Sequence, residues 1–196
     1  MTDLSITEIL ARSQSVQMKL AECCAERTEQ AAQMVAESLS AGGKLMFCGN
    51  GGSAGDSQHL SAEFVATLEH HRPREGMAAI ALTTDTSFLT AYANDFGFEG
   101  VFARQVEALG RAGDVLIAIS TSGNSKNIVA AAESARAKQI SVIGLTGEGG
   151  GRLASLSDIL IPAPSTITMH IQECHIALGH AMTARVEQLV ARHQER

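Results

Sequence analysis

The sequence predicts an α/β protein, a three-layer αβα sandwich in which helices cover both faces of a parallel sheet. Beyond the first quarter of the chain, short apolar runs alternate with helical patterns, as in a series of βαβ units. Two glycine- and serine-rich segments, 48–53 and 120–125, each follow an apolar run directly. Such continuous runs are typical of strands buried on both faces. With 196 residues, of which 45% are hydrophobic, we expect a single domain over 1–196, divided into N-terminal helices (about 1–43) and an αβα core (about 44–196).

The N-terminal region is predicted to form two helices. Ser5 and Glu8 have the Ser-x-x-Glu spacing of a capping box, and apolar residues follow at helical spacing from Ile6 to Leu20. A second helical pattern runs from about residue 28 to 39 and ends at two glycines, 42–43, which suit a left-handed C-cap. Helices before the first strand add no crossover to the sheet. They therefore either pack against another subunit or are buried on their own domain.

The remaining elements alternate along the chain. Strands are expected near residues 44–48, 78–82, 114–119, 141–145 and 158–161. Helices are expected from about residue 54, in short segments from about 86 and 102, and over about 125–138. The segment from 169 to about 192 is alanine-rich and lacks proline, so it is expected to form a closing helix.

Charge and composition argue against several classes of function. The formal net charge is −6 and no long run of Lys or Arg occurs, which argues against a nucleic-acid partner. No uninterrupted apolar stretch could span a bilayer, and the first residues lack the apolar core of a signal peptide. We expect a cytoplasmic enzyme or binding protein. The four cysteines, Cys23, Cys24, Cys48 and Cys174, are interpreted as reduced core residues.

The two glycine- and serine-rich segments are interpreted as paired phosphate cradles. Glycine lets the backbone approach an anion closely, and the following helix start and the hydroxyl groups supply hydrogen-bond donors. Because the carboxyl ends of parallel strands meet at one edge of the sheet, both loops should face the same ligand. An ordinary αβ turn also uses glycine and serine, so either loop alone would be ambiguous.

Polar side chains that could do chemistry lie on two of the predicted helices. His59 and Glu63 are four residues apart and share one helix face. On the closing helix, Gln172 and His180 are separated by about 80° around the axis and can share a stripe. If the two helices face one another, these four side chains form a nitrogen and oxygen cluster. It could hold Zn²⁺ or another divalent ion, or act as an acid/base set without metal.

A phosphate cradle beside a carboxylate and an imidazole suits proton transfer next to the carbonyl of a phosphorylated sugar. That chemistry is aldose–ketose isomerisation. Without further information, satisfied core polar groups or a surface ion pair would explain the same residues.

Taken together, these residues resemble the sugar isomerase (SIS) family, whose fold is flavodoxin-like, and within it the bacterial phosphoheptose isomerases. The resemblance covers nearly the whole chain. Beyond the two loops and the segment 58–63, it includes the segments 93–98, 113–116 and 145–147, and residues 171–173, 175 and 180.

The resemblance implies one Zn²⁺ per subunit, bound by His59, Glu63, Gln172 and His180. It implies that Glu63 moves a proton between C1 and C2 through an enediol, while His180 handles the oxygen proton. The implied reaction converts sedoheptulose 7-phosphate to D-glycero-D-manno-heptose 7-phosphate, the first step towards the ADP- or GDP-heptose precursors of lipopolysaccharide and other heptose-containing glycans.

The resemblance also implies a set of substrate contacts and an assembly. The implied substrate-binding residues are Asn50, Gly51, Gly52, Ser53, Glu63, Asn94, Asp95, Ser120, Thr121, Ser122, Ser125 and Gln172. Family members are homotetramers with sites at subunit boundaries, which would give the N-terminal helices an intersubunit role.

One position departs from the family pattern. Many members have an arginine four residues after the glutamate of this helix, where this chain has Thr67. The loss of that charge could change substrate affinity or preference, and Arg72 or Arg104 are candidates to compensate.

Two other functions remain open. A related SIS protein binds the bacterial replication initiator and lacks counterparts of Glu63 and His180; because this chain has both, the enzyme is favoured. An SIS isomerase or sensor for another sugar phosphate would keep the cradle and change the ligand.

Overall fold

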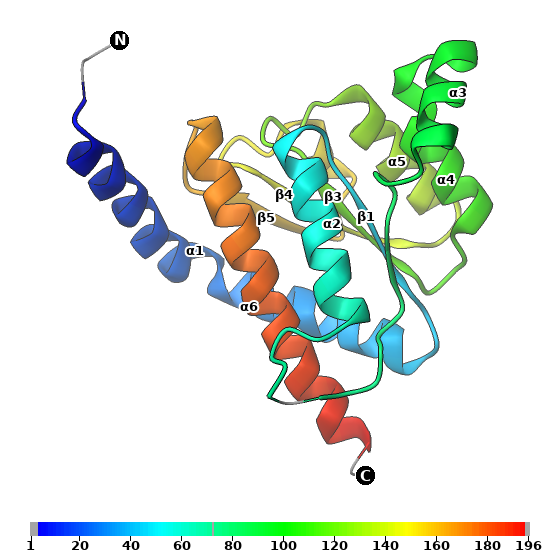
Figure 1. The fold of residues 1–196 in the computed structure, drawn as a ribbon, viewed down its shortest axis with the longest axis horizontal. Helices are drawn as coiled ribbons and strands as arrows, with labels where there is room; N and C mark the ends of the chain where they lie inside the picture. Colours follow the sequence, from blue (N-terminus) through cyan, green and yellow to red (C-terminus); the bar gives the residue numbers. More distant parts are fainter. Residues whose placement is uncertain (1–3, 72, 195–196) are drawn as a thin grey trace.

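The computed structural model describes residues 4–71 and 73–194, and its centre is a five-stranded sheet with all strands parallel (Figure 1). The strands are β1 (Leu45–Cys48), β2 (Ala79–Ala81), β3 (Val115–Ile119), β4 (Ser141–Gly147) and β5 (Ile159–Ala163). Their spatial order is β2-β1-β3-β4-β5, the order of flavodoxin-like folds. The predicted parallel sheet is confirmed, and its strands lie within two residues of the expected positions.

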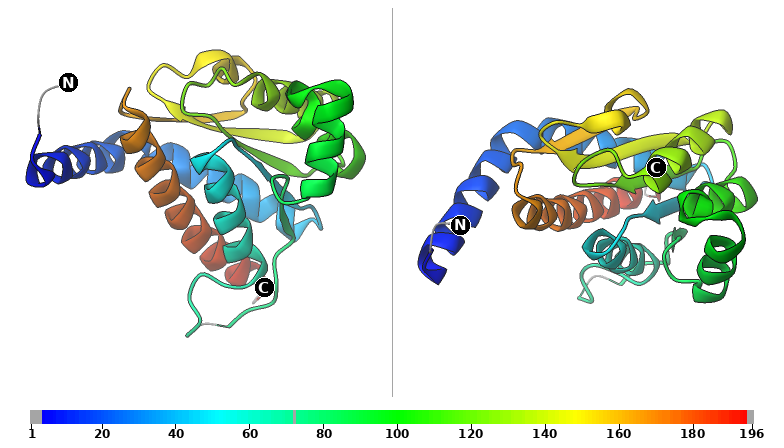
Figure 2. Two further views of the ribbon diagram at one scale, coloured as in Figure 1. Left: turned by 45° about the horizontal axis from the view of Figure 1, so that its top comes forward. Right: turned by 90° about the horizontal axis from the view of Figure 1, so that it is seen from above.

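Helices cover both faces of the sheet, as the sequence predicts for a three-layer sandwich (Figure 2). One face packs against α1 (Ile6–Ser40), α2 (Gly52–Val65) and α6 (Thr168–Gln194), and the other against α4 (Val101–Leu109) and α5 (Lys126–Ala137). Alternate strand residues serve the two cores: Phe47 faces the first, and its neighbours Met46 and Cys48 face the second. Helix α3 (Thr86–Phe96) and the 3₁₀ helices η1 (Phe98–Gly100) and η2 (Gly151–Ser155) complete the described elements.

The N-terminal region forms one helix, so the prediction of two helices is wrong. Helix α1 runs without interruption for 35 residues. Its buried stripe continues through Leu20, Cys24, Thr28 and Ala31, at the spacing of one helix face. The apolar pattern is interrupted in the sequence because cysteine and threonine occupy this stripe in place of larger apolar residues. No glycine or proline lies between residues 20 and 28 to end the helix.

Both predicted ends of this region are confirmed. The Ser5 hydroxyl accepts a hydrogen bond from the Glu8 N–H at 3.3 Å, and the Glu8 carboxylate accepts one from the Ser5 N–H at 2.8 Å. Gly42 has φ +82° just after the helix, as a left-handed C-terminal residue requires. The C-terminal half of α1 is buried on its own domain, whereas the N-terminal half projects beyond the sheet (Figures 1 and 2).

Three of the four cysteines are buried and all four are free. Burial raises the pKa of the Cys48 thiol to about 12 and that of Cys174 to about 11, so both remain thiols at neutral pH. Cys23 is exposed on α1, and its interpretation as a core residue is wrong because it lies one position outside the buried stripe.

The strand order explains why the two glycine-rich loops meet. From β1 the chain crosses to β2 at one side, and from β3 it crosses to β4 at the other. The loops that follow β1 and β3 therefore lie side by side at the carboxyl edge of the sheet, at the position where open α/β folds bind ligands. Within the described part of the chain, no helix combines the length and hydrophobicity needed to cross a bilayer.

Candidate functional site

The first loop brings the chain from β1 into α2 by a tight turn. Gly51 has φ +57° and is the N-cap of α2 without a side-chain cap, so only a residue without Cβ adopts the turn without strain. A Cβ on Gly49 would lie 2.4 Å from the Ser53 carbonyl oxygen. The glycines therefore serve the turn itself, and they leave the first N–H groups of α2 available to an anion.

The second loop is held by hydrogen bonds from the end of β4 and from η2, which flank a glycine-rich turn. The Thr121 carbonyl accepts from the Gly147 N–H at 2.9 Å, and the Gly123 carbonyl accepts from the Leu153 N–H at 3.0 Å. Within the loop, the hydroxyls of Ser120 and Ser125 lie 2.9 Å apart. These hydrogen bonds fix the position of the loop. As the sequence predicts, this one loop carries Ser120, Thr121, Ser122 and Ser125.

The two loops are connected to one another through side-chain amides. Asn50 of the first loop and Asn127, in the first turn of α5, each donate to the other, both at 2.8 Å. Asn127 is buried. The family resemblance implies that Asn50 contacts substrate, and its amide also links the two loops.

Side chains from α2 and α6 converge beside these loops. His59 Nε2 lies 2.7 Å from His180 Nε2 and 3.6 Å from Glu63 Oε1. One ligand atom from each of the three residues lies within 4.8 Å of the other two. The helices α2 and α6 therefore face one another, as the predicted cluster requires. Two imidazoles and a carboxylate that share one space can hold a divalent cation or a shared proton.

Gln172, the fourth predicted member of this cluster, lies directly over the first loop. A Cβ on Gly52 would be 2.5 Å from Gln172 Nε2. The lack of a side chain at Gly52 therefore makes room for the amide, and the contact joins α6 to the start of α2. Along α6, Gln172 thus lies next to the first loop, and His180 lies in the cluster with His59 and Glu63.

Asp56 belongs to the same face and was not singled out from the sequence. It lies one turn before His59 on α2, and its Oδ2 atom is buried without a hydrogen-bond partner among the described residues. Burial raises the pKa of the Asp56 carboxyl, while His59 and His180 act in the opposite direction. The spacing of three residues to His59 could have identified it, because residues three apart share a helix face.

Asn94 and Asp95 lie apart from this cluster on the same chain. Both are exposed near the end of α3, where the Asn94 amide donates to Asp95 Oδ1 at 2.8 Å. Helix α3 packs against η1 and α4 at the far end of the molecule from α6 (Figures 1 and 2).

His175 is another of the residues that carry the family resemblance. His175 Nε2 donates to the Thr146 carbonyl at 3.0 Å, so this buried residue anchors α6 to β4 and does not join the cluster.

The position that departs from the family pattern, Thr67, lies just after the C-cap of α2. The Thr67 hydroxyl donates to the Glu69 carbonyl at 3.3 Å. Arg104 pairs with Glu107 at 3.2 Å and its guanidinium lies 5.8 Å from the Tyr92 ring centroid on the opposite face of the sheet, which does not favour a compensating role. Arg72 lies outside the described residues.

A comparison with protein families matches residues 10–147 to the SIS domain. This chain belongs to the SIS domain family. The match covers both loops and the α2 residues of the cluster, so the family resemblance stated from the sequence is confirmed.

Relatives of this SIS domain with high identity are phosphoheptose isomerases. That of Rhodospirillum rubrum is 56% identical over 165 residues, covering 84% of this chain and 86% of the relative. That of Akkermansia muciniphila is 53% identical, with 81% and 83% covered. Among solved structures, the phosphoheptose isomerase from Neisseria gonorrhoeae superposes with a TM-score of 0.88 at 44% identity, covering 93% of this chain and 97% of that one.

Proposed function

We propose that this protein isomerises sedoheptulose 7-phosphate to D-glycero-D-manno-heptose 7-phosphate. The observation that carries the proposal is the convergence of Glu63, His59 and His180 beside two linked glycine-rich loops. The high identity to proteins named phosphoheptose isomerase supports it. The reaction would supply a precursor of ADP- or GDP-heptose for lipopolysaccharide and other glycans, and the free cysteines suit a cytoplasmic setting.

The dimensions of the site suit a long sugar phosphate. His59 is seven residues beyond Gly52 on α2, which corresponds to about 10 Å along the helix axis. A heptose 7-phosphate carries its phosphate at one end of the carbon chain and the reacting C1 and C2 at the other. We infer that Asn50, Gly51, Gly52 and Ser53 with the hydroxyls of the second loop bind the phosphate end, and that the cluster meets C1 and C2.

In the proposed mechanism, Glu63 removes a proton from C1 of the ketose and returns it to C2. Electrons of the broken C1–H bond form the C1–C2 double bond of an enediol, and the carbonyl oxygen at C2 takes up a proton. His180 moves the oxygen protons, delivering one to O2 and accepting one from O1 as the C1 aldehyde forms. A carboxylate and an imidazole in one site suit these two roles because both side chains can accept and release protons as general acid–base groups.

A metal ion fits the cluster. Two imidazoles and one carboxylate form a donor set used by catalytic zinc sites, and the buried Oδ2 of Asp56, which has no hydrogen-bond partner among the described residues, lies on the same helix as His59 and Glu63. We propose that His59, Glu63, Gln172 and His180 hold one Zn²⁺ per subunit. When bound, the ion would polarise the substrate oxygens next to the carbon that loses its proton.

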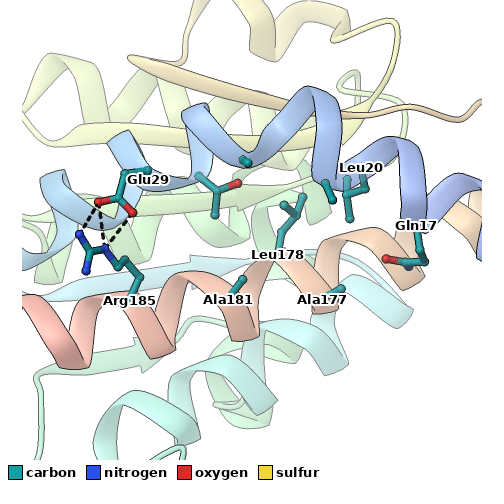
Figure 3. A pocket seen from close by; sticks show the side chains of 10 residues that line it. Gln17, Leu20, Glu29, Ala177, Leu178, Ala181 and Arg185 are labelled. Atoms are coloured by element: carbon teal, nitrogen blue, oxygen red, sulfur yellow. Dashed lines mark hydrogen bonds and ion pairs between the residues drawn. The ribbon is translucent and has the colours of Figure 1, made fainter.

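We further propose a homotetramer with sites at subunit boundaries. Ile6, Leu10 and Met18 on the projecting half of α1 are 64–72% exposed, and a groove of about 390 Å³ lies between α1 and α6 (Figure 3). Apolar side chains, among them Leu20 and Leu178, line that groove beside the Glu29–Arg185 ion pair. An apolar surface with a polar rim suits a second copy of the chain, and Asn94 and Asp95 could then serve a neighbouring site.

Two measurements test these proposals. The purified protein is incubated with sedoheptulose 7-phosphate in D₂O, with and without added zinc, and followed by NMR. New aldose signals and deuterium at the reacting carbons are expected; no product and no exchange under either condition would contradict the assignment. Sedimentation equilibrium should give a tetramer, and Leu10→Glu combined with Met18→Glu should give smaller species. A monomeric wild-type protein would contradict the assembly.

A further inference from the structure

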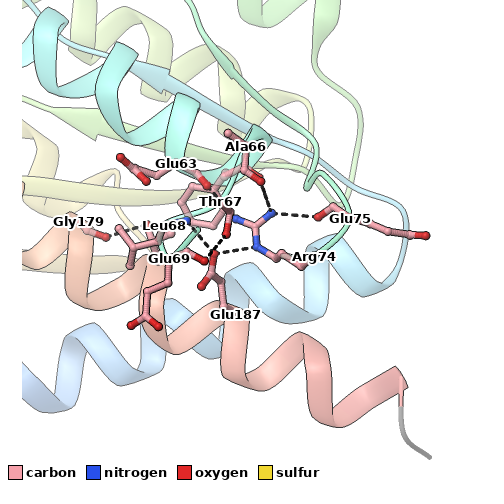
Figure 4. Close-up of polar contacts among 11 residues, drawn as sticks. Glu63, Ala66, Thr67, Leu68, Glu69, Arg74, Glu75, Gly179 and Glu187 are labelled. Atoms are coloured by element: carbon pink, nitrogen blue, oxygen red, sulfur yellow. Dashed lines mark hydrogen bonds and ion pairs between the residues drawn. The ribbon is translucent and has the colours of Figure 1, made fainter. Parts of the chain in front are cut away.

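An arginine from the loop after α2 binds the carboxyl end of that helix (Figure 4). Arg74 Nη2 donates to the Glu63 carbonyl at 2.8 Å, and Nη1 donates to the Phe64 carbonyl at 2.9 Å and the Ala66 carbonyl at 3.3 Å. These carbonyls belong to the last turn of α2 and to its C-cap. A single guanidinium therefore holds the end of the helix that carries His59 and Glu63.

This contact supplies what α2 lacks in its own sequence. The last turn of α2 contains no basic residue, and the last four carbonyls of any α-helix have no partner within the helix. A cation at that end also interacts favourably with the helix dipole. Arginine suits the position because its planar fork offers several donors at fixed angles, whereas lysine is a point charge.

The same guanidinium is tied to α6. Arg74 Nε lies 2.7 Å from Glu187 Oε1, which also accepts from the Leu68 N–H at 3.1 Å. The Arg74 and Glu187 side chains are only 17% and 16% exposed, so water screens this ion pair less than one at the surface. Glu187 lies seven residues after His180, two helical turns along the same side of α6.

The result is a bridge between the two helices that form the cluster. On α2 it bonds to the main chain of Glu63 itself, and on α6 it ends two turns from His180. The 2.7 Å contact between the His59 and His180 nitrogens requires α2 and α6 to keep their separation closely. A shift of about 1 Å in a catalytic group can reduce a rate by about 100-fold.

We propose that Arg74 is a positioning residue for the isomerase, which sets Glu63 against His180 through its bonds to the end of α2 and to Glu187. This inference rests on the proposed function. Arg74 does not replace the charge missing at Thr67, because its donors are directed to main-chain carbonyls and to Glu187.

The test compares three bridge variants with a matched control. Arg74→Gln removes the whole bridge, Arg74→Lys keeps the charge without the fork, and Glu187→Gln keeps an acceptor oxygen without the charge. Arg136→Gln is the control: Arg136 also pairs with a carboxylate, Asp158, and donates to a carbonyl, that of Leu156. It lies in the last turn of α5, on the opposite face of the sheet from α2 and α6.

Two readouts are measured for each folded variant: kcat and KM for sedoheptulose 7-phosphate, and the imidazole ¹H–¹⁵N spectrum of the metal-free protein. We expect Arg74→Gln to lower kcat by about 10- to 100-fold with a much smaller change in KM, and to shift the ring signals of His59 and His180. The kcat values and the ring-signal shifts of Arg74→Lys and Glu187→Gln should lie between those of Arg74→Gln and the wild type. Arg136→Gln should change neither readout.

Other outcomes would overturn the inference. An Arg74→Gln protein with kcat near the wild-type value, or with unshifted His59 and His180 signals, would show that the bridge does not position the cluster. If Arg136→Gln lowered kcat as much as Arg74→Gln does, the loss would not be specific to the bridge, and the inference would also be overturned. If Arg74→Gln fails to fold, Glu187→Gln decides by the same readouts. An inactive wild-type protein would instead contradict the proposed function, and the imidazole signals alone would then decide the positioning role.

Discussion

The side-chain amides of Asn50 and Asn127 form a reciprocal pair in which each Nδ2 donates to the other's Oδ1 at 2.8 Å. The pair joins the loop after β1 to the helix that follows the loop after β3, across the switch point of the sheet. Because each amide donates to the other and accepts from it, neither loop can move relative to the other without breaking two hydrogen bonds in a partly buried place. The two cradles should therefore act as one anion site.

Asn127→Asp is expected to separate the cradles. The carboxylate has no donor for Asn50 Oδ1, and an unsatisfied buried polar group costs about 1–3 kcal/mol. We expect a lower melting temperature and a KM for the sugar phosphate raised about 10-fold, with a smaller change in kcat. Steady-state kinetics and thermal denaturation measure this, with Ser134→Ala further along α5 as the control. An unchanged KM in a folded variant would mean that the pair serves stability alone.

Two glycines of α2 offer a matched pair of substitutions. Gly52→Ala places a Cβ 2.5 Å from Gln172 Nε2, whereas nothing lies within 4 Å of a Cβ on Gly55. We expect Gly52→Ala to displace Gln172 and to weaken both zinc affinity and kcat/KM by at least about 10-fold. Gly55→Ala should leave both unchanged and stabilise the protein by up to about 1 kcal/mol. Competition with a chelator measures the zinc affinity, and steady-state kinetics measure kcat/KM. If the two variants had the same zinc affinity and kcat/KM, Gln172 would have no role in the site.

Glu63→Gln tests the proposed proton carrier. The amide keeps the shape of the side chain and cannot accept the carbon-bound proton, and positioned acid/base groups contribute about 10²–10⁴-fold to rate. We expect kcat to fall within that range, together with deuterium incorporation from D₂O, while the circular dichroism spectrum stays the same. Glu107→Gln on α4 serves as the surface control. Near-wild-type turnover in Glu63→Gln would remove this residue from the proposed role.

The buried His175 should make stability depend on pH. Burial lowers its pKa from 6.5 to about 4, and its Nδ1 has no hydrogen-bond partner among the described residues. Between these two values the unfolded chain binds a proton that the folded protein does not, so the free energy of unfolding falls as the pH drops. The contribution lost between pH 7 and pH 5 is about 2 kcal/mol, at about 1.4 kcal/mol per pKa unit.

Urea denaturation at the two pH values measures this loss. His175→Gln, which can still donate to the Thr146 carbonyl, should lose less stability on acidification than the wild type, while His70→Gln in the exposed loop should behave like the wild type. A wild-type and a His175→Gln protein with the same pH dependence would show that another group is responsible.

The sequence by itself determined the strands of the sheet, the glycine-rich loops and which residues share one face of a helix. Strands buried on both faces must be apolar throughout, so β1 and β3 are recognisable without a partner. A glycine-rich turn after such a strand and the four-residue spacing of His59 and Glu63 are equally local, because helix geometry alone puts those two residues on one face. The capping box at Ser5 and Glu8 is local in the same sense.

Only the tertiary structure decided how these pieces meet. His59 and His180 are 121 residues apart, and their contact depends on the order of the strands and on the packing of α2 against α6, which no local spacing encodes. The same holds for Gln172 over Gly52, for Asn50 with Asn127 and for Arg74 with Glu187. Helix α1 was wrongly predicted as two helices for the same reason. Its buried stripe passes through Cys24 and Thr28, and burial against α6 and β5, rather than hydrophobicity along the chain, makes it one continuous helix.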